Sequence, residues 1–271
     1  SNTSTIPISL LTKGMPRKFC ERFAITHFFN PVRFMRLLEL VRGEFTRDEV
    51  IDTLDLFSEK ILGKGVVSCL DTPGFLANRV GVFAIQCALH KAFEYKLSPT
   101  EADAFFGRPL GLPKTGVFGL YDLIGIDLMA DVVKSLVSIL PENDAFHNYS
   151  SQIKFMTKMI ANGQTGNKNE KGFYKQIGDE RQVIDLSNGS YGPHERLKTP
   201  LLEEAEKIGI SFIIKNTSPY GLYVWDVISE TLCYAASLVP EVTDDLTQID
   251  DAMKLGYNWV QGPFELLDEI G

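Results

Sequence analysis

Two apolar runs near the start of the chain, residues 22–29 and 35–41, constrain its fold more than any other feature. In each run the apolar side chains occupy both alternating faces, which predicts strands that are covered on both sides. The second run contains Glu39, on the same strand face as Leu37 and Val41. Because a buried carboxylate is costly unless a partner compensates it, the fold has to supply one.

His27, near the C-terminal end of the first run, is the nearest candidate partner in sequence. Ligands of open α/β sheets bind at that end of the strands. A histidine that holds a carboxylate on one ring nitrogen keeps the other nitrogen free as a general base. From these residues alone two other interpretations stay open: His27 can be a structural residue, and Glu39 can face water on an edge strand.

Four phrases around this pair occur in a fixed order: S-N-T-S at 1–4, T-H-F-F-N-P at 26–31, L-L-E-L-V at 37–41 and D-T-P-G-F-L-A-N-R at 71–79. Each phrase alone is a weak signal. Together they resemble the L-3-hydroxyacyl-CoA dehydrogenase family of fatty-acid β-oxidation, and the resemblance covers nearly the whole chain. It implies NAD-dependent oxidation of an (S)-3-hydroxyacyl-CoA substrate to 3-ketoacyl-CoA.

The resemblance also implies roles for five residues. His27 is the base that takes the proton from the substrate 3-hydroxyl, and Glu39 orients and electrostatically supports it. Ser4 and Asn78 hold the reacting oxygen, and Asn30 lies where the family's motif approaches the nicotinamide end of the cofactor. By composition alone, Asn78 would be a solvated residue in the first turns of a helix.

The pattern of elements changes at Pro73, which predicts an α-rich multidomain chain. Before it, strand and helix patterns alternate, as in the C-terminal part of a doubly wound α/β (Rossmann-type) domain. After it helices dominate. The expected domains are 1–71, the C-terminal portion of the NAD-binding domain; 72–176, a helical C-terminal domain, copy 1; 177–198, hairpin and linker; and 199–271, copy 2.

The two helical copies are recognised by an internal repeat. G-V-F-G-L-Y-D-L-I-G at 116–125 matches G-P-F-E-L-L-D-E-I-G at 262–271, and each follows a long apolar helix, at 75–95 and 219–239. Two copies resemble multifunctional members of the family. We expect the long helices to pack together as an intramolecular pseudo-two-fold pair. The second copy lacks D-T-P-G-F-x-x-N and is expected to be structural only.

Local signals refine the helix boundaries. T-R-D-E at 46–49 and S-P-T-E at 98–101 both match the capping box, so each predicts a helix start. The helical pattern at 146–162 predicts one continuous helix, and 172–186 predicts a small hairpin.

Composition excludes several other classes of protein. The net charge of −8 argues against a general nucleic-acid binder, and no run reaches the roughly 18 apolar residues of a membrane helix. The four cysteines and the remaining histidines lack metal-ligand spacing, so we predict no metal site. The scattered cysteines fit a reducing compartment, such as the cytoplasm of a bacterial parent.

The cofactor loop is missing from the sequence, because no G-x-G-x-x-G occurs in it. In the resembled family that loop belongs to a dinucleotide-binding domain that precedes S-N-T-S. We therefore expect a fragment of a longer protein, truncated at its C-terminus as well and inactive alone. The phrases P-K-T-G-V-F at 113–118 and G-F-Y-K at 172–175 resemble bacterial fusions with a downstream enoyl-CoA hydratase. Two alternatives stay open: a non-catalytic helical assembly module of a multifunctional β-oxidation protein, or a dehydrogenase of another 3-hydroxy acid.

Overall fold

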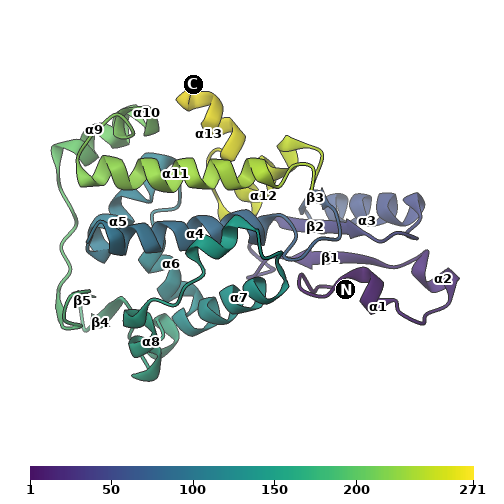
Figure 1. Cartoon of the computed structure of the whole chain (residues 1–271), viewed down its shortest axis with the longest axis horizontal. Coiled ribbons are helices and arrows are strands. Elements are labelled where there is room, and N and C mark those ends of the chain that lie inside the picture. The colour runs from purple at the N-terminus through teal and green to yellow at the C-terminus, as the bar shows by residue number, and fades with distance from the viewer. The chain divides into compact units, whose positions relative to one another are not determined.

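The computed structural model describes residues 1–271, which form two compact units. The first unit comprises Ser1–Val82, Leu232–Glu269 and Gly271, and the second comprises Phe83–Thr231 and Ile270. Two long helices, α4 (Ala77–Glu94) and α11 (Pro219–Ser237), contribute residues to both units (Figure 1). No helix is both long and apolar enough to span a bilayer.

The remaining elements divide between the two units. Those of the first unit are α1 (Ile8–Leu11), α2 (Arg17–Cys20), β1 (Ala24–Phe28), β2 (Leu37–Arg42), α3 (Asp48–Lys60), β3 (Gly65–Cys69), α12 (Leu246–Tyr257) and nearly all of α13 (Pro263–Ile270). Those of the second unit are α5 (Pro99–Phe105), η1 (Arg108–Leu110), α6 (Gly116–Ile124), α7 (Ile126–Ile139), η2 (Ala145–Tyr149), α8 (Lys154–Ala161), η3 (Asn167–Asn169), β4 (Tyr174–Ile177), β5 (Glu180–Ile184), β6 (Tyr191–Pro193), α9 (Pro200–Ile208) and α10 (Ile210–Ile213).

The first unit is built on the sheet β1-β2-β3, with α3 beside it in Figure 1. Strand β1 runs antiparallel to β2, and the register sets His27 opposite Glu39. Strand β3 is parallel to β2, so the chain crosses over through α3. Both predicted apolar strands are therefore present.

The two faces of β2 are covered by different helices, as the apolar pattern predicts. Leu38 and Leu40 pack in one cluster with Ile51 and Leu54 of α3. The alternate residues point the other way, because successive side chains of a strand alternate between faces. On that side Gly256 of α12 approaches Leu37 so closely that a Cβ atom on it would lie 2.6 Å from the leucine Cδ2. Glu39 belongs to this second face.

The two expected capping boxes have different outcomes. Ser98 and Glu101 form a reciprocal box at the start of α5, as predicted. The box expected at Thr46 is wrong, because Arg47 is the N-cap of α3 and makes no side-chain cap. The Thr46 hydroxyl instead accepts a hydrogen bond from the backbone N–H of Gly43 and donates one to the Phe23 carbonyl. These bonds use the side chain that would have capped α3.

Two further expectations need correction. The single helix predicted over 146–162 is divided into η2 and α8. Near the break, the Ser150 hydroxyl donates to the His147 carbonyl, which is the kind of local bond that competes with helix propagation. The hairpin β4–β5 is present, but part of the expected linker forms the third strand, β6.

The two segments of the internal repeat, residues 116–125 and 262–271, each begin next to an aspartate of the preceding part of the chain. In the second unit Asp103 of α5 accepts hydrogen bonds from the N–H groups of Phe118, at 2.7 Å, and Gly119, at 3.0 Å. In the first unit Asp250 of α12 accepts one from the N–H of Phe264, at 2.8 Å. An aspartate on a short helix thus holds the first turn of the next helix in both places.

Helices α4 and α11 contact each other within each unit. In the first unit the buried guanidinium of Arg79 donates to the Tyr234 hydroxyl at 2.7 Å. In the second unit the Tyr95 hydroxyl donates to Asp226 at 2.9 Å, and Lys91 forms an ion pair with the same carboxylate at 3.1 Å. The start of α4 therefore contacts the end of α11. The end of α4 contacts the N-terminal half of α11.

Candidate active site

Glu39 is fully buried at the centre of the candidate site. One carboxylate oxygen, Oε2, lies 2.6 Å from Nδ1 of His27. The other, Oε1, accepts hydrogen bonds from the backbone N–H groups of Leu76, at 2.9 Å, and Ala77, at 2.8 Å. These groups lie at the N-terminus of α4, where the helix dipole stabilises a negative charge. The burial cost of the carboxylate is thereby offset.

The His27 ring is held with one nitrogen engaged and one free. Its side chain is 12% exposed, and its ring meets those of Phe29 and Phe75 edge-on, with centroids 5.4 and 5.6 Å away. Because the Glu39 carboxylate accepts from Nδ1, that atom carries the proton. The Nε2 atom makes no hydrogen bond within the chain. The ring can therefore accept a proton there.

Ser4 and Asn78 lie together in the same unit. The Asn78 side-chain amide donates to the Ser4 hydroxyl at 3.3 Å. The Ser4 carbonyl accepts from the N–H of Gly74 at 2.8 Å, which ties the first residues of the chain to the turn before α4. Asn78 follows Ala77 directly, so the turn that holds Glu39 also carries this amide. The expected juxtaposition of these two polar residues is present.

Asn30 lies just beyond the end of β1 and is exposed, without a side-chain hydrogen bond to the rest of the chain. Its amide is therefore available to a ligand at the C-terminal end of this strand. No hydrogen bond joins it to Ser4 or Asn78, so hydrogen bonds bring four of the five predicted residues into two pairs and leave out Asn30.

Two groups near the site, Asp71 and Tyr257, were not predicted from the sequence. Asp71 accepts a hydrogen bond from the Ile8 N–H at 2.8 Å and so helps hold the segment after Ser4. Burial raises the pKa of the Tyr257 hydroxyl, and the charge of Glu39 raises it further. Asp71 is part of D-T-P-G-F and could have been noticed there. Tyr257 comes from α12, and no local pattern connects it with β2.

Chemically, the His27–Glu39 pair has the arrangement of a general base with a fixed tautomer. A carboxylate on Nδ1 keeps the lone pair on Nε2 and stabilises the imidazolium that forms when Nε2 takes a proton. The Ser4 hydroxyl and the Asn78 amide are hydrogen-bond groups suited to an oxygen at the reacting carbon. The His27–Glu39 pair is therefore an arrangement that can abstract a proton from a hydroxyl group placed against Nε2.

The residues present suit only part of a dinucleotide. Rossmann-type domains hold the pyrophosphate at a glycine-rich turn that opens a helix, and this sequence has no G-x-G-x-x-G. The helix that follows β2 begins after the segment G-E-F-T-R, in which Thr46 is used by Gly43 and Phe23. At the end of β1, Nε2 of His27 and the exposed side chain of Asn30 make no hydrogen bond within the chain.

Comparison with known proteins connects this geometry with a family. The model of the 3-hydroxyacyl-CoA dehydrogenase NAD binding domain matches residues 1–72, and that of the family's C-terminal domain matches 74–176. Together they cover more than half of the chain, and both predicted domain types are thus found.

Relatives along the whole chain carry related names. A fatty acid oxidation complex trifunctional enzyme of Rickettsia prowazekii is 43% identical over 98% of this chain, which covers 37% of that protein. A 3-hydroxyacyl-CoA dehydrogenase of Bacillus subtilis is 34% identical over 100% of this chain, which covers 35% of it. The chain thus spans about a third of the length of these relatives.

A solved structure shows the same fold. The crystal structure of 3-hydroxybutyryl-CoA dehydrogenase from Escherichia coli superposes with a TM-score of 0.71 at 21% identity, over 100% of this chain and 68% of that one. With the domain matches and the relatives, the conclusion is that this chain belongs to the 3-hydroxyacyl-CoA dehydrogenase family, with a Rossmann-type portion followed by a helical C-terminal domain.

Proposed function

We propose that this chain carries the catalytic base of an NAD-dependent (S)-3-hydroxyacyl-CoA dehydrogenase of fatty-acid β-oxidation. The observation that carries the proposal is the buried Glu39 carboxylate, which binds Nδ1 of His27 at 2.6 Å and leaves Nε2 without a partner. A carboxylate placed only for structure would not need a histidine whose second nitrogen is free. The names of the family and of the relatives support the acyl-CoA substrate class.

In this proposal each residue has one role. Nε2 of His27 takes the proton of the substrate 3-hydroxyl, while Glu39 holds the ring and stabilises its protonated form. Ser4 and Asn78 bind the reacting oxygen, and Asn30 binds near the nicotinamide. A bound NAD⁺ would supply the acceptor for the hydride that leaves the substrate carbon. The product is the 3-ketoacyl-CoA.

We propose further that these 271 residues do not perform the reaction alone. The sequence lacks the glycine loop that binds the pyrophosphate. The parent would be a longer, cytoplasmic bacterial protein, to which a downstream enoyl-CoA hydratase can belong. The trifunctional name of the Rickettsia relative, and the third of its length that the chain matches, support this view. If the chain never acts in catalysis, the alternative is a helical assembly module.

The proposal also includes the domain order. Residues 1–71 form the end of the NAD-binding domain, 72–176 and 199–271 the two helical copies, and 177–198 the connection. The equivalent roles of Asp103 and Asp250, each of which binds the first turn of the next helix, support the duplication.

The duplication also predicts the oligomeric state. If the second copy covers the surface that a partner subunit would otherwise cover, light scattering should show a monomer. A stable dimer would contradict the intramolecular pair.

The experiment for the activity is a substitution in the product of the full-length gene. His27→Gln should lower kcat for 3-hydroxyacyl-CoA by about 10²- to 10⁴-fold, because general base catalysis contributes that much. NAD⁺ affinity should stay within about twofold. His147→Gln is the matched control, because that ring bonds only to the Pro141 carbonyl. Full activity in His27→Gln, or loss of NAD⁺ binding together with activity, would refute the assigned role.

A further inference from the structure

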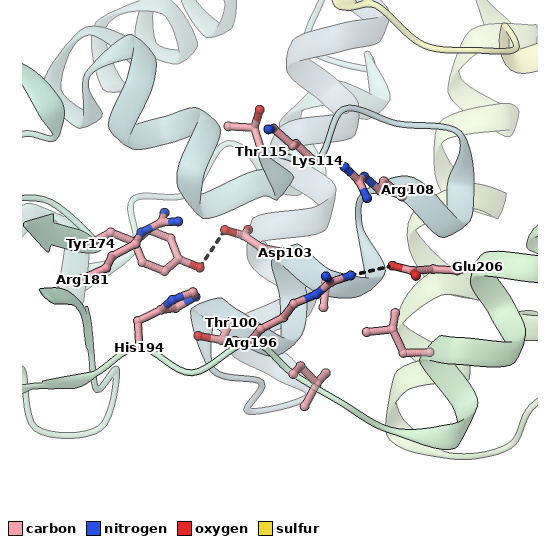
Figure 2. A pocket seen from close by; sticks show the side chains of 13 residues that line it. Thr100, Asp103, Arg108, Lys114, Thr115, Tyr174, Arg181, His194, Arg196 and Glu206 are labelled. Carbon is pink, nitrogen blue, oxygen red and sulfur yellow. Dashed lines mark hydrogen bonds and ion pairs between the residues drawn. The ribbon is translucent and has the colours of Figure 1, made fainter. Parts of the chain in front are cut away.

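The second unit contains a pocket of about 260 Å³ whose lining belongs entirely to that unit and includes none of the predicted site residues. Its walls come from four parts of the chain: α5 with η1, the turn before α6, the β4–β5–β6 sheet with the segment after it, and α9. Figure 2 shows polar and charged side chains from all four converging on this space.

The pocket is rich in positive charge, although the chain as a whole carries a net charge of −8. Four cationic side chains line it, and only two carboxylates, of Asp103 and Glu206, accompany them. The cations are Arg108, Lys114, Arg181 and Arg196. A concave site lined by one sign of charge concentrates ligands of the opposite sign.

The Asp103 carboxylate is already engaged and neutralises little of this charge. It accepts hydrogen bonds from the N–H groups of Phe118 and Gly119 and, at 2.8 Å, from the Tyr174 hydroxyl. None of its bonds comes from a pocket cation. Burial raises the pKa of Asp103 to about 7, so at neutral pH the carboxylate is only partly ionised.

The four cations are exposed and lack strong partners. Arg108 and Lys114 form no ion pair, and the Arg181 guanidinium stacks over the Tyr174 ring at 4.1 Å. Arg196 contacts Glu206 at a loose 3.4 Å, and its side chain is 69% exposed. Such a pair contributes little energy and is readily exchanged for another anion. At least three cations are thus available to a ligand.

From this arrangement we propose that the pocket binds the phosphate group of a small phosphorylated molecule. Guanidinium groups bind phosphate through two parallel hydrogen bonds, and an ammonium adds a point charge. The Thr115 hydroxyl lines the same space and can donate to a remaining phosphate oxygen, whereas the Thr100 hydroxyl beside it interacts with the Tyr174 hydroxyl. The volume lies below the roughly 300–1,000 Å³ of pockets for drug-sized ligands, which favours a small organic phosphate.

The binding site does not depend on the proposed dehydrogenase chemistry, because no lining residue belongs to the unit that holds His27 and Glu39. A bound phosphate would connect η1 and the turn before α6 with β5 and the segment that leads to α9. It would therefore stabilise the contact of α5 and α6 with the segment that leads into α9.

The test is calorimetric titration of the 271-residue chain with inorganic phosphate and with glycerol 3-phosphate, at constant ionic strength. Both should bind, and Lys114→Glu or Arg108→Glu should weaken binding at least tenfold, which corresponds to about 1.4 kcal/mol. Lys134→Glu is the matched control: it is an exposed lysine of α7, in the same unit, outside the pocket and without an ion pair. It should leave affinity within about twofold, as expected of a distant, screened surface charge.

A further variant and further ligands distinguish specific phosphate binding from general attraction of anions. Arg108→Lys keeps the charge but loses the two-pronged geometry, so it should weaken binding less than Arg108→Glu does. Circular dichroism should show that every variant is folded. Absence of phosphate binding to the unaltered chain would overturn the proposal. So would an equal loss in Lys134→Glu, or acetate and citrate binding as tightly as glycerol 3-phosphate.

Discussion

The Nδ1 atom of His27 lies 2.6 Å from Oε2 of Glu39, across the antiparallel pair β1–β2. The second oxygen of the same carboxylate accepts from two N–H groups at the start of α4. One buried charge therefore joins the sheet, the imidazole and the helix that carries Asn78. Removing it should affect stability as well as catalysis.

We predict that Glu39→Gln destabilises the chain. The glutamine carbonyl can accept from the N–H groups of α4 or from Nδ1 of His27, and the amide group then faces the other partner. The N–H groups of α4 cannot accept from it, and Nδ1 can do so only if the ring moves its proton to Nε2. A buried donor left without an acceptor costs about 1–3 kcal/mol. Urea unfolding should show this loss relative to Glu44→Gln, which alters an exposed carboxylate with no partner. Equal midpoints for the two variants would mean that the second oxygen of Glu39 is not needed by the His27 ring and the N–H groups of α4.

The His27–Glu39 contact could be predicted because it depends on local features. Two apolar runs with a short connection predict neighbouring strands, and a carboxylate inside one of them requires a partner. The N–H groups of Leu76 and Ala77 could not be predicted in this way. They reach Glu39 through a turn in which Gly74 has φ 80° and Phe75 has φ 52°, and no pattern of polarity indicates that a phenylalanine adopts this conformation.

Two other features could not be predicted from local sequence, because one depends on a competing hydrogen bond and the other on segments far apart in the chain. The Thr46 motif predicted a cap, yet the hydroxyl binds the Phe23 carbonyl, a residue 23 positions away. The pocket of the second unit combines side chains from residue 100 to residue 206, and each of its four cations alone resembles a solvated surface charge. Sequence spacing predicts contacts within one element or between neighbours, and both of these arise from tertiary packing.

A second prediction concerns the cofactor. The chain alone should bind NAD⁺ no more tightly than millimolar, which corresponds to about −4 kcal/mol, because it lacks the glycine loop that approaches the pyrophosphate. The product of the full-length gene, titrated in the same calorimeter, is the positive control. Micromolar binding to the 271 residues would show that other groups hold the dinucleotide.

A third prediction tests the packing of α12 on α4. A Cβ atom on Gly81 would lie 2.1 Å from Cζ of Tyr257, whose ring is packed edge-on against Phe29. Gly81→Ala should therefore lower the free energy of unfolding by about 1–3 kcal/mol, as overpacked cores do. Gly192→Ala is the control, since a Cβ there meets nothing within 4 Å. Equal melting temperatures would mean that the tyrosine ring moves aside without cost.

A fourth prediction uses the raised pKa of Asp103, about 7 in the folded chain against a usual value of 3.8. Between these two pH values the folded state binds more protons than the unfolded state, so this group's contribution to stability falls as pH rises. The contribution is fully present below about pH 4. The advantage of the native chain over Asp103→Asn in urea unfolding should therefore shrink from pH 4 to pH 7. A difference independent of pH would show that the pKa of Asp103 is the same in the folded and unfolded chain.

The last prediction compares two aspartates that match in the internal repeat. The carboxylate of Asp122 accepts from the buried N–H groups of Phe173, at 2.8 Å, and Tyr174, at 2.7 Å. Its counterpart, Asp268, is exposed and accepts no hydrogen bond from another residue. Asp122→Ala leaves two buried donors unpaired and should cost about 1–3 kcal/mol or more.

Asp268→Ala should change stability by no more than about 0.5 kcal/mol, as is usual for exposed positions. The pair is a matched experiment, because the same substitution is made at the same place in two related helices, α6 and α13. Urea unfolding of both variants compares how much each of the two matching aspartates contributes to the free energy of unfolding. A large cost at Asp268 would reveal a partner that this carboxylate acquires in solution. No cost at Asp122 would mean that water replaces the carboxylate at Phe173 and Tyr174, and that the hairpin is not anchored there.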